Sequence, residues 1–195
     1  IPNGYEKYYS ERIIRMPNSY QCNDDKKEIC NEPIFRKDFN LPDNAFVFTC
    51  FCANKKITPK EFNIWMNLLK EIQGSVLWLY QSNEYAVKNL INEAKSRDVN
   101  PNRIIFAKKL PLKKHLSRHS LGDLGLDTFN YNGHTTTSDA LWAGLPVLTK
   151  IGESFAARVS ASILTAIDLS ELITYNEKEY EEKALYLARN PDELE

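Results

Sequence analysis

Polar side chains crowd the predicted start of one helix, within the stretch YNGHTTTSDALWAG. Gly133 permits a sharp turn, and His134, Thr135, Thr136 and, one turn later, Asp139 follow it. The first amides of a helix lack partners and carry the positive end of its dipole, so they bind phosphate. A carboxylate on the face of Thr135 can accept hydrogen bonds from ribose hydroxyls. The spacing therefore suits a nucleotide sugar, although Thr and Asn also cap helices that bind nothing, and an early Asp also complements the dipole.

The elements that must position these residues alternate regularly from residue 45 onward. Continuous apolar runs predict buried strands, and amphipathic stretches between them predict helices. The predicted strands span 45–52, 75–80, 103–108, part of 121–129 with an end near Asp127, and 145–150. The predicted helices span 58–72, 83–98, 110–120, 131–144, 154–167 and 176–190, with Thr58, Ser154 and Asn176 as caps. Asp127 is expected to anchor the following loop by hydrogen bonds, and Trp142 is expected to lie in the core.

Strands that alternate with helices indicate βαβ units, so we expect an α/β fold with a Rossmann-like, doubly wound parallel sheet. In such sheets, ligands bind outside the carboxyl ends of the strands. The polar clusters at 54–56, 110–118 and 132–139 each follow a predicted strand. We therefore expect all three clusters at one edge of the sheet.

Residues 1–44 differ in character from residues 45–195. The first segment is rich in Tyr, Asn, Asp, Lys and Pro and has little periodicity. It is expected to be an arm or inter-lobe linker, with a short helix at most, ahead of a Rossmann-like nucleotide-sugar-binding lobe. The chain begins with Ile1 in place of Met, which suggests a fragment of a longer protein.

Composition argues against several classes of protein. The formal net charge of -1 disfavours nucleic-acid binding, and no apolar run approaches the roughly 20 residues of a membrane helix. No signal peptide is visible. The four cysteines lack the spacing of metal ligands, so we expect free thiols, no metal site and a reducing, cytoplasmic location.

A long motif resembles a known family. YNGHTTTSDALWAGLPVLTKIGESFAARVSASIL, with the preceding LGDLGLDT, resembles the C-terminal catalytic half of the O-GlcNAc transferase family, which includes the SPINDLY-like proteins. FVFTCFCANKKITP and the run from SVLWLYQSN to NRIIFAKKLP resemble its preceding blocks, so the similarity covers about 40–185. The arm segment YYSERIIRMPNSYQCND resembles the segment that joins the two catalytic lobes. The resemblance implies the C-terminal lobe of a GT-B glycosyltransferase, with an N-terminal lobe and probable TPR repeats outside this chain.

The resemblance also implies roles for individual residues. Lys56 and His134 are the catalytic candidates: Lys56 would contact the diphosphate, and His134 would lie beside the sugar and diphosphate as a hydrogen-bond donor. A cation at Lys56 would neutralise charge that develops on the departing nucleotide diphosphate. Thr135 and Thr136 would bind the diphosphate, and Asp139 would bind the ribose. Lys56 is otherwise one of a solvated pair with its neighbour ahead of a helix.

Three residues are expected around the base of the nucleotide. The resemblance implies that His115 packs on the uracil ring, that Arg118 lies at its edge, and that the backbone of Leu110 reads the uracil edge. An imidazole or a guanidinium over a flat base is a reasonable stacking platform. Alternatively, His115 and Arg118 belong to one face of a basic surface helix.

Two positions depart from the family pattern. Leu112 stands where the family often has a lysine that reaches the ribose, and Ala53 stands where it often has Gln or Asn. Lys113 and Asn54 are the residues that would have to compensate. Either departure could change the donor, for example to UDP-glucose or GDP-fucose, or abolish donor binding.

The resemblance therefore predicts the UDP-sugar-binding half of an inverting protein O-linked N-acetylglucosamine transferase. Its expected partners are a nucleotide sugar, UDP-N-acetylglucosamine or a relative, and Ser/Thr hydroxyls of proteins. No cofactor or metal is expected, because cationic and dipolar groups replace the metal of other transferases. The isolated chain is expected to bind UDP weakly without turnover. The alternative is a non-catalytic, transferase-like binding module.

Overall fold

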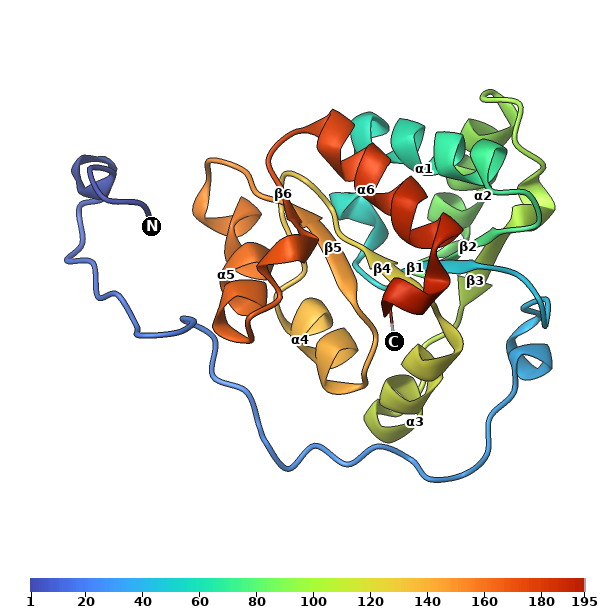
Figure 1. Ribbon diagram of the computed structural model, residues 1–195, viewed down its shortest axis with the longest axis horizontal. Helices are drawn as coiled ribbons and strands as arrows, with labels where there is room; N and C mark the ends of the chain where they lie inside the picture. The colour runs from blue at the N-terminus through green and yellow to red at the C-terminus, as the bar shows by residue number, and fades with distance from the viewer. Residues whose placement is uncertain (195) are drawn as a thin grey trace.

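The computed structural model describes residues 1–194 and has one six-stranded parallel sheet (Figure 1). The spatial order is β3-β2-β1-β4-β5-β6, in which the chain reverses direction across the sheet between β1 and β4. Such a reversal is the topological switch point of a doubly wound fold, where a crevice opens at the carboxyl ends. The strands are β1 Val47–Cys50, β2 Val76–Tyr80, β3 Ile104–Ala107, β4 Leu124–Leu126, β5 Val147–Lys150 and β6 Ile173–Thr174.

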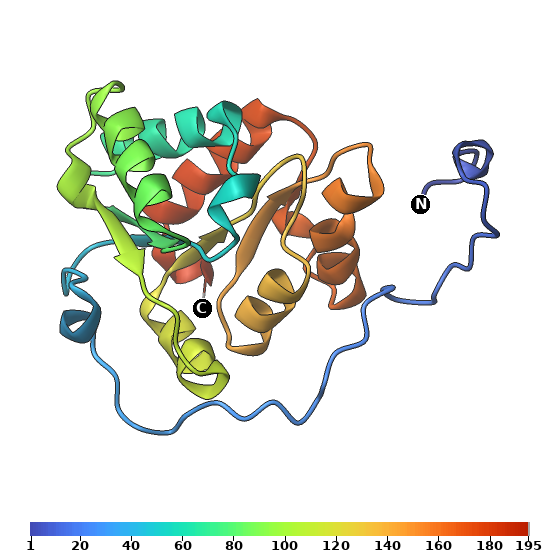
Figure 2. The same cartoon turned by 180° about the vertical axis from the view of Figure 1, so that it is seen from behind.

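Six α-helices connect and flank the strands. They are α1 Pro59–Glu71, α2 Glu84–Lys95, α3 Leu112–Ser117, α4 Thr135–Trp142, α5 Val159–Ala166 and α6 Glu177–Arg189. Figures 1 and 2 show α1, α2 and α6 on one side of the sheet and α3 and α4 on the other, with α5 beside α4. The expected doubly wound arrangement is thereby confirmed.

The sequence explains where most helices begin. Thr58 and Glu61 form a capping box at the start of α1, with Pro59 at the first helical position. The Asn83 and Asn176 side chains accept hydrogen bonds from the third amide of α2 and α6. Ser154 is a cap as predicted, but it caps a single 3-10 turn, Phe155–Ala157, and α5 begins only at Val159.

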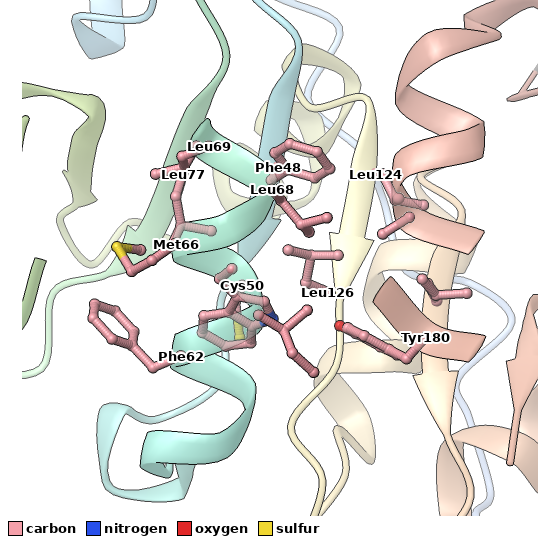
Figure 3. Packing of buried hydrophobic residues seen from close by; sticks show 14 of the residues in the cluster. Phe48, Cys50, Phe62, Met66, Leu68, Leu69, Leu77, Leu124, Leu126 and Tyr180 are labelled. Atoms are coloured by element: carbon pink, nitrogen blue, oxygen red, sulfur yellow. The ribbon is translucent and has the colours of Figure 1, made fainter. Parts of the chain in front are cut away.

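The main core lies between the sheet and the helices α1 and α6. Figure 3 shows Phe48 and Leu124 of the strands packed against Leu68 of α1 and Tyr180 of α6. Tyr180 is fully buried, and its hydroxyl donates to the carbonyl of Asp127 at 3.3 Å. The core therefore fixes the end of β4, from which the chain continues toward α4.

Residues 1–44 form an arm with two 3-10 turns, Glu6–Tyr8 and Arg36–Phe39. Figure 2 shows it running around the edge of the molecule, past α4 and α3, before it enters the sheet. Its last part packs on the core through Ile34, Phe39 and Leu41. The Arg36 guanidinium bonds both carboxylate oxygens of Asp123, at 3.0 and 3.1 Å.

Within residues 1–194, no helix combines the length and apolarity needed to span a bilayer.

Candidate functional site

Two loops that follow the central strands meet at the carboxyl edge of the sheet. The 3-10 turn Asn54–Lys56 follows β1, and the loop before α4 follows β4, which pairs with β1. The Lys56 Nζ donates to the carbonyl of Asn132 at 2.9 Å and lies 4.0 Å from the centre of the Tyr131 ring. Lys56 therefore closes over the loop that leads into α4, as the sequence predicted.

The start of α4 offers free hydrogen-bond donors. Among the described residues, the backbone N–H groups of Thr135 and Thr136 have no acceptor. The Thr135 side chain is exposed and that of Thr136 half-buried, while the Thr137 hydroxyl is bonded to Ser160 at 2.8 Å. The first two threonines are thus available to an anion, whereas the third holds α4 to α5.

His134 lies at the centre of an aromatic cluster. Its ring stacks on Tyr131 with centroids 4.8 Å apart, and its Nδ1 lies 2.7 Å from the Tyr20 hydroxyl. Partial burial, together with the nearby Lys56 charge, lowers the pKa of His134. A neutral ring at pH 7 follows, which agrees with a role as a hydrogen-bonding group and not as a cation.

Asp127 holds the loop between β4 and α4 in place. Its Oδ1 accepts from the amides of Thr128 at 2.9 Å and Gly133 at 2.6 Å, and its Oδ2 accepts from the Thr149 hydroxyl at 2.7 Å. The sequence predicted an anchor for the following loop here, and these bonds confirm it. Burial raises the pKa of Asp127 to about 6, against the lowering effect of its hydrogen bonds.

Gly133 leaves no room for a side chain. A Cβ there would contact the Thr137 hydroxyl and would lie 2.7 Å from that of Thr136. We expect Gly133→Ala to destabilise the protein by about 1–3 kcal/mol and to weaken UDP binding, because the start of α4 must shift. Gly122→Ala is the matched control, since its Cβ would overpack Thr49 at the other end of β4. Chemical denaturation should report both losses of stability, whereas calorimetry should report lost UDP binding only for Gly133→Ala; equal UDP affinities would contradict this.

Three arm side chains contact the residues expected to bind the donor. Tyr20 bonds His134, the Gln21 Nε2 donates to the Thr135 Oγ1 at 3.2 Å, and the Lys27 Nζ lies 2.5 Å from the Asp139 Oδ1. These three arm residues were not predicted from the sequence, because a polar segment without periodicity carries no signal for the helix that it covers.

Trp142 helps to hold the arm against α4. The sequence suggested a core position for it, but the side chain is 45% exposed. Its Nε1 donates to the carbonyl of Lys27 at 3.1 Å. An exposed indole at the end of α4 thus serves as an anchor for the arm.

The expected base-binding residues lie along α3 and the loop before it. Leu110 is half-buried, and its backbone N–H and C=O have no hydrogen-bond partner among the described residues. The His115 ring makes edge contacts with Phe51 and His119, with centroids 5.5 and 4.7 Å apart. Burial lowers the pKa of His115 to about 3, with smaller contributions from Arg118 and His119, so the ring is neutral and suited to stacking on a base.

Arg118 is buried, so the alternative that it belongs to an exposed basic face of a surface helix is wrong. It is 1% exposed, its Nη1 donates to the carbonyl of Lys108 at 2.7 Å, and its guanidinium lies over the Phe51 and Trp78 rings. Burial lowers the pKa of Arg118 to about 10, which still leaves it charged at neutral pH. Here it braces the loop before α3, and contact with the base remains a prediction.

The two residues considered as compensation are both engaged elsewhere. The Asn54 side chain is buried and donates to the carbonyl of Tyr80 at 2.8 Å, so it ties two strand ends together. The Lys113 ammonium pairs with Glu28 of the arm. Neither side chain points a free polar group at the start of α4 in this conformation.

Comparison with known proteins gives a consistent match. A family model described as Glycosyl transferase family 41 matches residues 26–195. A probable UDP-N-acetylglucosamine–peptide N-acetylglucosaminyltransferase SEC from Arabidopsis thaliana is 36% identical over 100% of this chain and 20% of its own length. A probable enzyme of the same description, SPINDLY from Solanum lycopersicum, is 31% identical over 99% of this chain and 21% of its own.

A solved structure agrees with these relatives. A mutant of the Thermobaculum terrenum O-GlcNAc transferase superposes with a TM-score of 0.85 at 28% identity, over 99% of this chain and 37% of that one. This chain therefore spans about a fifth of the length of these curated relatives and just over a third of the solved structure.

Proposed function

Because this chain belongs to glycosyltransferase family 41, we propose that it is the donor-binding lobe of a protein O-linked N-acetylglucosamine transferase. The observation that carries the proposal is the meeting of Lys56 with the start of α4. The ammonium is bonded to the loop that delivers the free amides of Thr135 and Thr136. A cation and two oriented amides at one edge of a doubly wound sheet suit a diphosphate.

Each group then has a task in the reaction. The acceptor hydroxyl oxygen bonds to the anomeric carbon from the face opposite the diphosphate, its proton passes to water, and the bond from that carbon to the β-phosphate oxygen breaks. The leaving diphosphate takes the electron pair. Lys56 and the amides of α4 stabilise the negative charge that this oxygen gains. Asp139 accepts from the ribose, while Leu110 and His115 hold the uracil.

Further parts of the longer protein complete the enzyme under this proposal. An additional lobe closes the cleft over the donor and presents a Ser or Thr hydroxyl of a protein acceptor. The isolated chain therefore binds the nucleotide but transfers no sugar.

Titration calorimetry on this chain tests donor binding. UDP should bind more tightly than UMP or uridine, because only UDP places a second phosphate at the amides and Lys56. UDP should also bind more tightly than GDP, since the proposal assigns Leu110 and His115 to a uracil ring. Absence of heat with UDP, or equal affinities for UDP and uridine, would refute the proposal and favour a non-catalytic module. Preference for GDP would redirect it to another donor.

A further inference from the structure

The contact between Lys27 and Asp139 is the most enclosed ion pair of the described chain. Their side chains are 14% and 8% exposed, whereas every other ion pair has at least one partner that is 32% exposed or more. Surface pairs contribute little, but removing one partner of an enclosed pair leaves a poorly solvated charge. The two residues are 112 positions apart, so this pair fixes the arm on α4.

The backbone of the arm is held at this lysine and again at Cys30. The Trp142 indole donates to the carbonyl of Lys27 itself, and the Cys30 amide donates to the carbonyl of Lys113 at 3.2 Å. An open groove runs between this part of the arm and the start of α3, and its lining includes Lys27, Pro111 and Leu112. Lys27 therefore lies between the carboxylate of α4 and a space that a ligand can enter.

The arm contacts leave hydrogen-bonding capacity on the groups that they join. Lys27 has three N–H donors and uses one on the Asp139 Oδ1, and Asp139 Oδ2 has no hydrogen-bond partner among the described residues. Gln21 uses an acceptor position of the Thr135 hydroxyl, whose own hydrogen stays available. The arm thus orients these groups without saturating them.

We propose that Lys27 is a donor-binding residue, which forms with Asp139 a two-residue site for the ribose of a nucleoside diphosphate. This inference rests on the proposed function. Asp139 accepts one ribose hydroxyl through Oδ2, and the Lys27 ammonium donates to the neighbouring hydroxyl oxygen. Lys27 also brings a second positive charge to α4, in addition to that of Lys56 at the loop before it. The arm is therefore a wall of the donor site and not a cover that donor binding must remove.

Calorimetry with variants of this chain tests the inference. Lys27→Met should weaken UDP binding about tenfold, and Lys27→Arg should recover part of that loss, since the charge and donors remain. Lys37→Met is the matched control, because this lysine of the arm is exposed, has no ion pair among the described residues and does not line the groove. It should leave UDP affinity unchanged.

A second ligand separates ribose recognition from a structural role. The molecules 2′-deoxy-UDP and 3′-deoxy-UDP each lack one of the two hydroxyls, so Lys27→Met should weaken the binding of one of them clearly less than that of UDP. Equal losses for all three nucleotides would show that Lys27 acts only by holding the arm, and would overturn the inference. Unchanged or tighter UDP binding by Lys27→Met would also overturn it, the tighter case meaning that the arm competes with the donor.

The proposed function fails on different evidence. If the unaltered chain binds no UDP, the donor site itself is absent. If the unaltered chain binds UDP and Lys56→Met weakens it while Lys27→Met does not, the function stands and only the role of Lys27 is wrong.

Discussion

Lys56→Met is expected to lower sugar transfer by the full-length protein by about 10²–10³-fold, mainly in kcat. The physical reason is the place of the ammonium. It is bonded to the carbonyl of Asn132, on the loop that leads to the free amides of α4, and stacked on Tyr131 at 4.0 Å. Removing one pre-oriented donor from developing negative charge typically costs a factor of this size.

Comparing the effect of Lys56→Met on kcat with its effect on KM separates stabilisation of the leaving group from donor binding. The donor of the proposed function already bears two negative phosphate groups before reaction, so Lys56 is expected to contribute to binding as well. The bridging oxygen gains charge only as the bond to the sugar breaks, and that gain is lost from kcat. We therefore expect UDP affinity of this chain to fall about tenfold and kcat of the full-length enzyme to fall further.

Lys55→Met is the control for this experiment. Lys55 occupies the adjacent position of the same 3-10 turn but is exposed and has no ion pair among the described residues. Its loss changes the net charge by the same amount, so long-range electrostatic effects cancel in the comparison. If both variants lose activity equally, or if only KM rises for Lys56→Met, the assignment of Lys56 to the departing diphosphate is wrong.

The part of the site built on sheet topology could be predicted from the sequence. Lys56 and His134 follow strands that are neighbours at the switch point, so the order of strands alone brings them together. The capping residues Thr58 and Asn176 could also be predicted, since helix capping depends on residues that are close in sequence. Strand β6 was not predicted, because its two residues are too few to leave a pattern in the sequence.

Contacts that depend on the arm could not be predicted. Lys27 and Asp139 are separated by 112 residues, and nothing in a polar, aperiodic segment encodes its register against α4. The burial of Arg118 could not be predicted either. A charged residue in a basic helix gives no sign that it will be buried against an aromatic ring and a backbone carbonyl. Trp142 was misplaced for the converse reason, since its size suggested burial although its N–H is used at the surface.

Asp127 links stability to the geometry of the site and gives the prediction with the largest effect on folding. The side chain is 2% exposed and accepts from two amides and one hydroxyl. Asp127→Ala leaves those donors without an acceptor, at about 1–3 kcal/mol each where they stay dry. We expect a loss of roughly 3–5 kcal/mol in the free energy of unfolding, together with weaker UDP binding, because the Gly133 amide no longer fixes the start of α4.

The pH dependence distinguishes the charge of Asp127 from its hydrogen bonds. Burial raises its folded-state pKa to about 6 from an ordinary value of 3.8, so the folded state holds the proton more tightly than the unfolded state. The resulting stabilisation is fully present below pH 3.8 and is lost as pH rises through about 6. Asp127→Asn cannot titrate, so its stability should gain on the unaltered chain by roughly 2–2.5 kcal/mol between pH 4 and pH 7.5. Urea unfolding of both proteins across this range measures the difference, with the exposed Asp192→Asn as control. If the free energy of unfolding has the same pH dependence in the Asp127→Asn variant and the unaltered chain, burial does not destabilise the charged carboxylate. Its hydrogen bonds alone would then set the position of the loop.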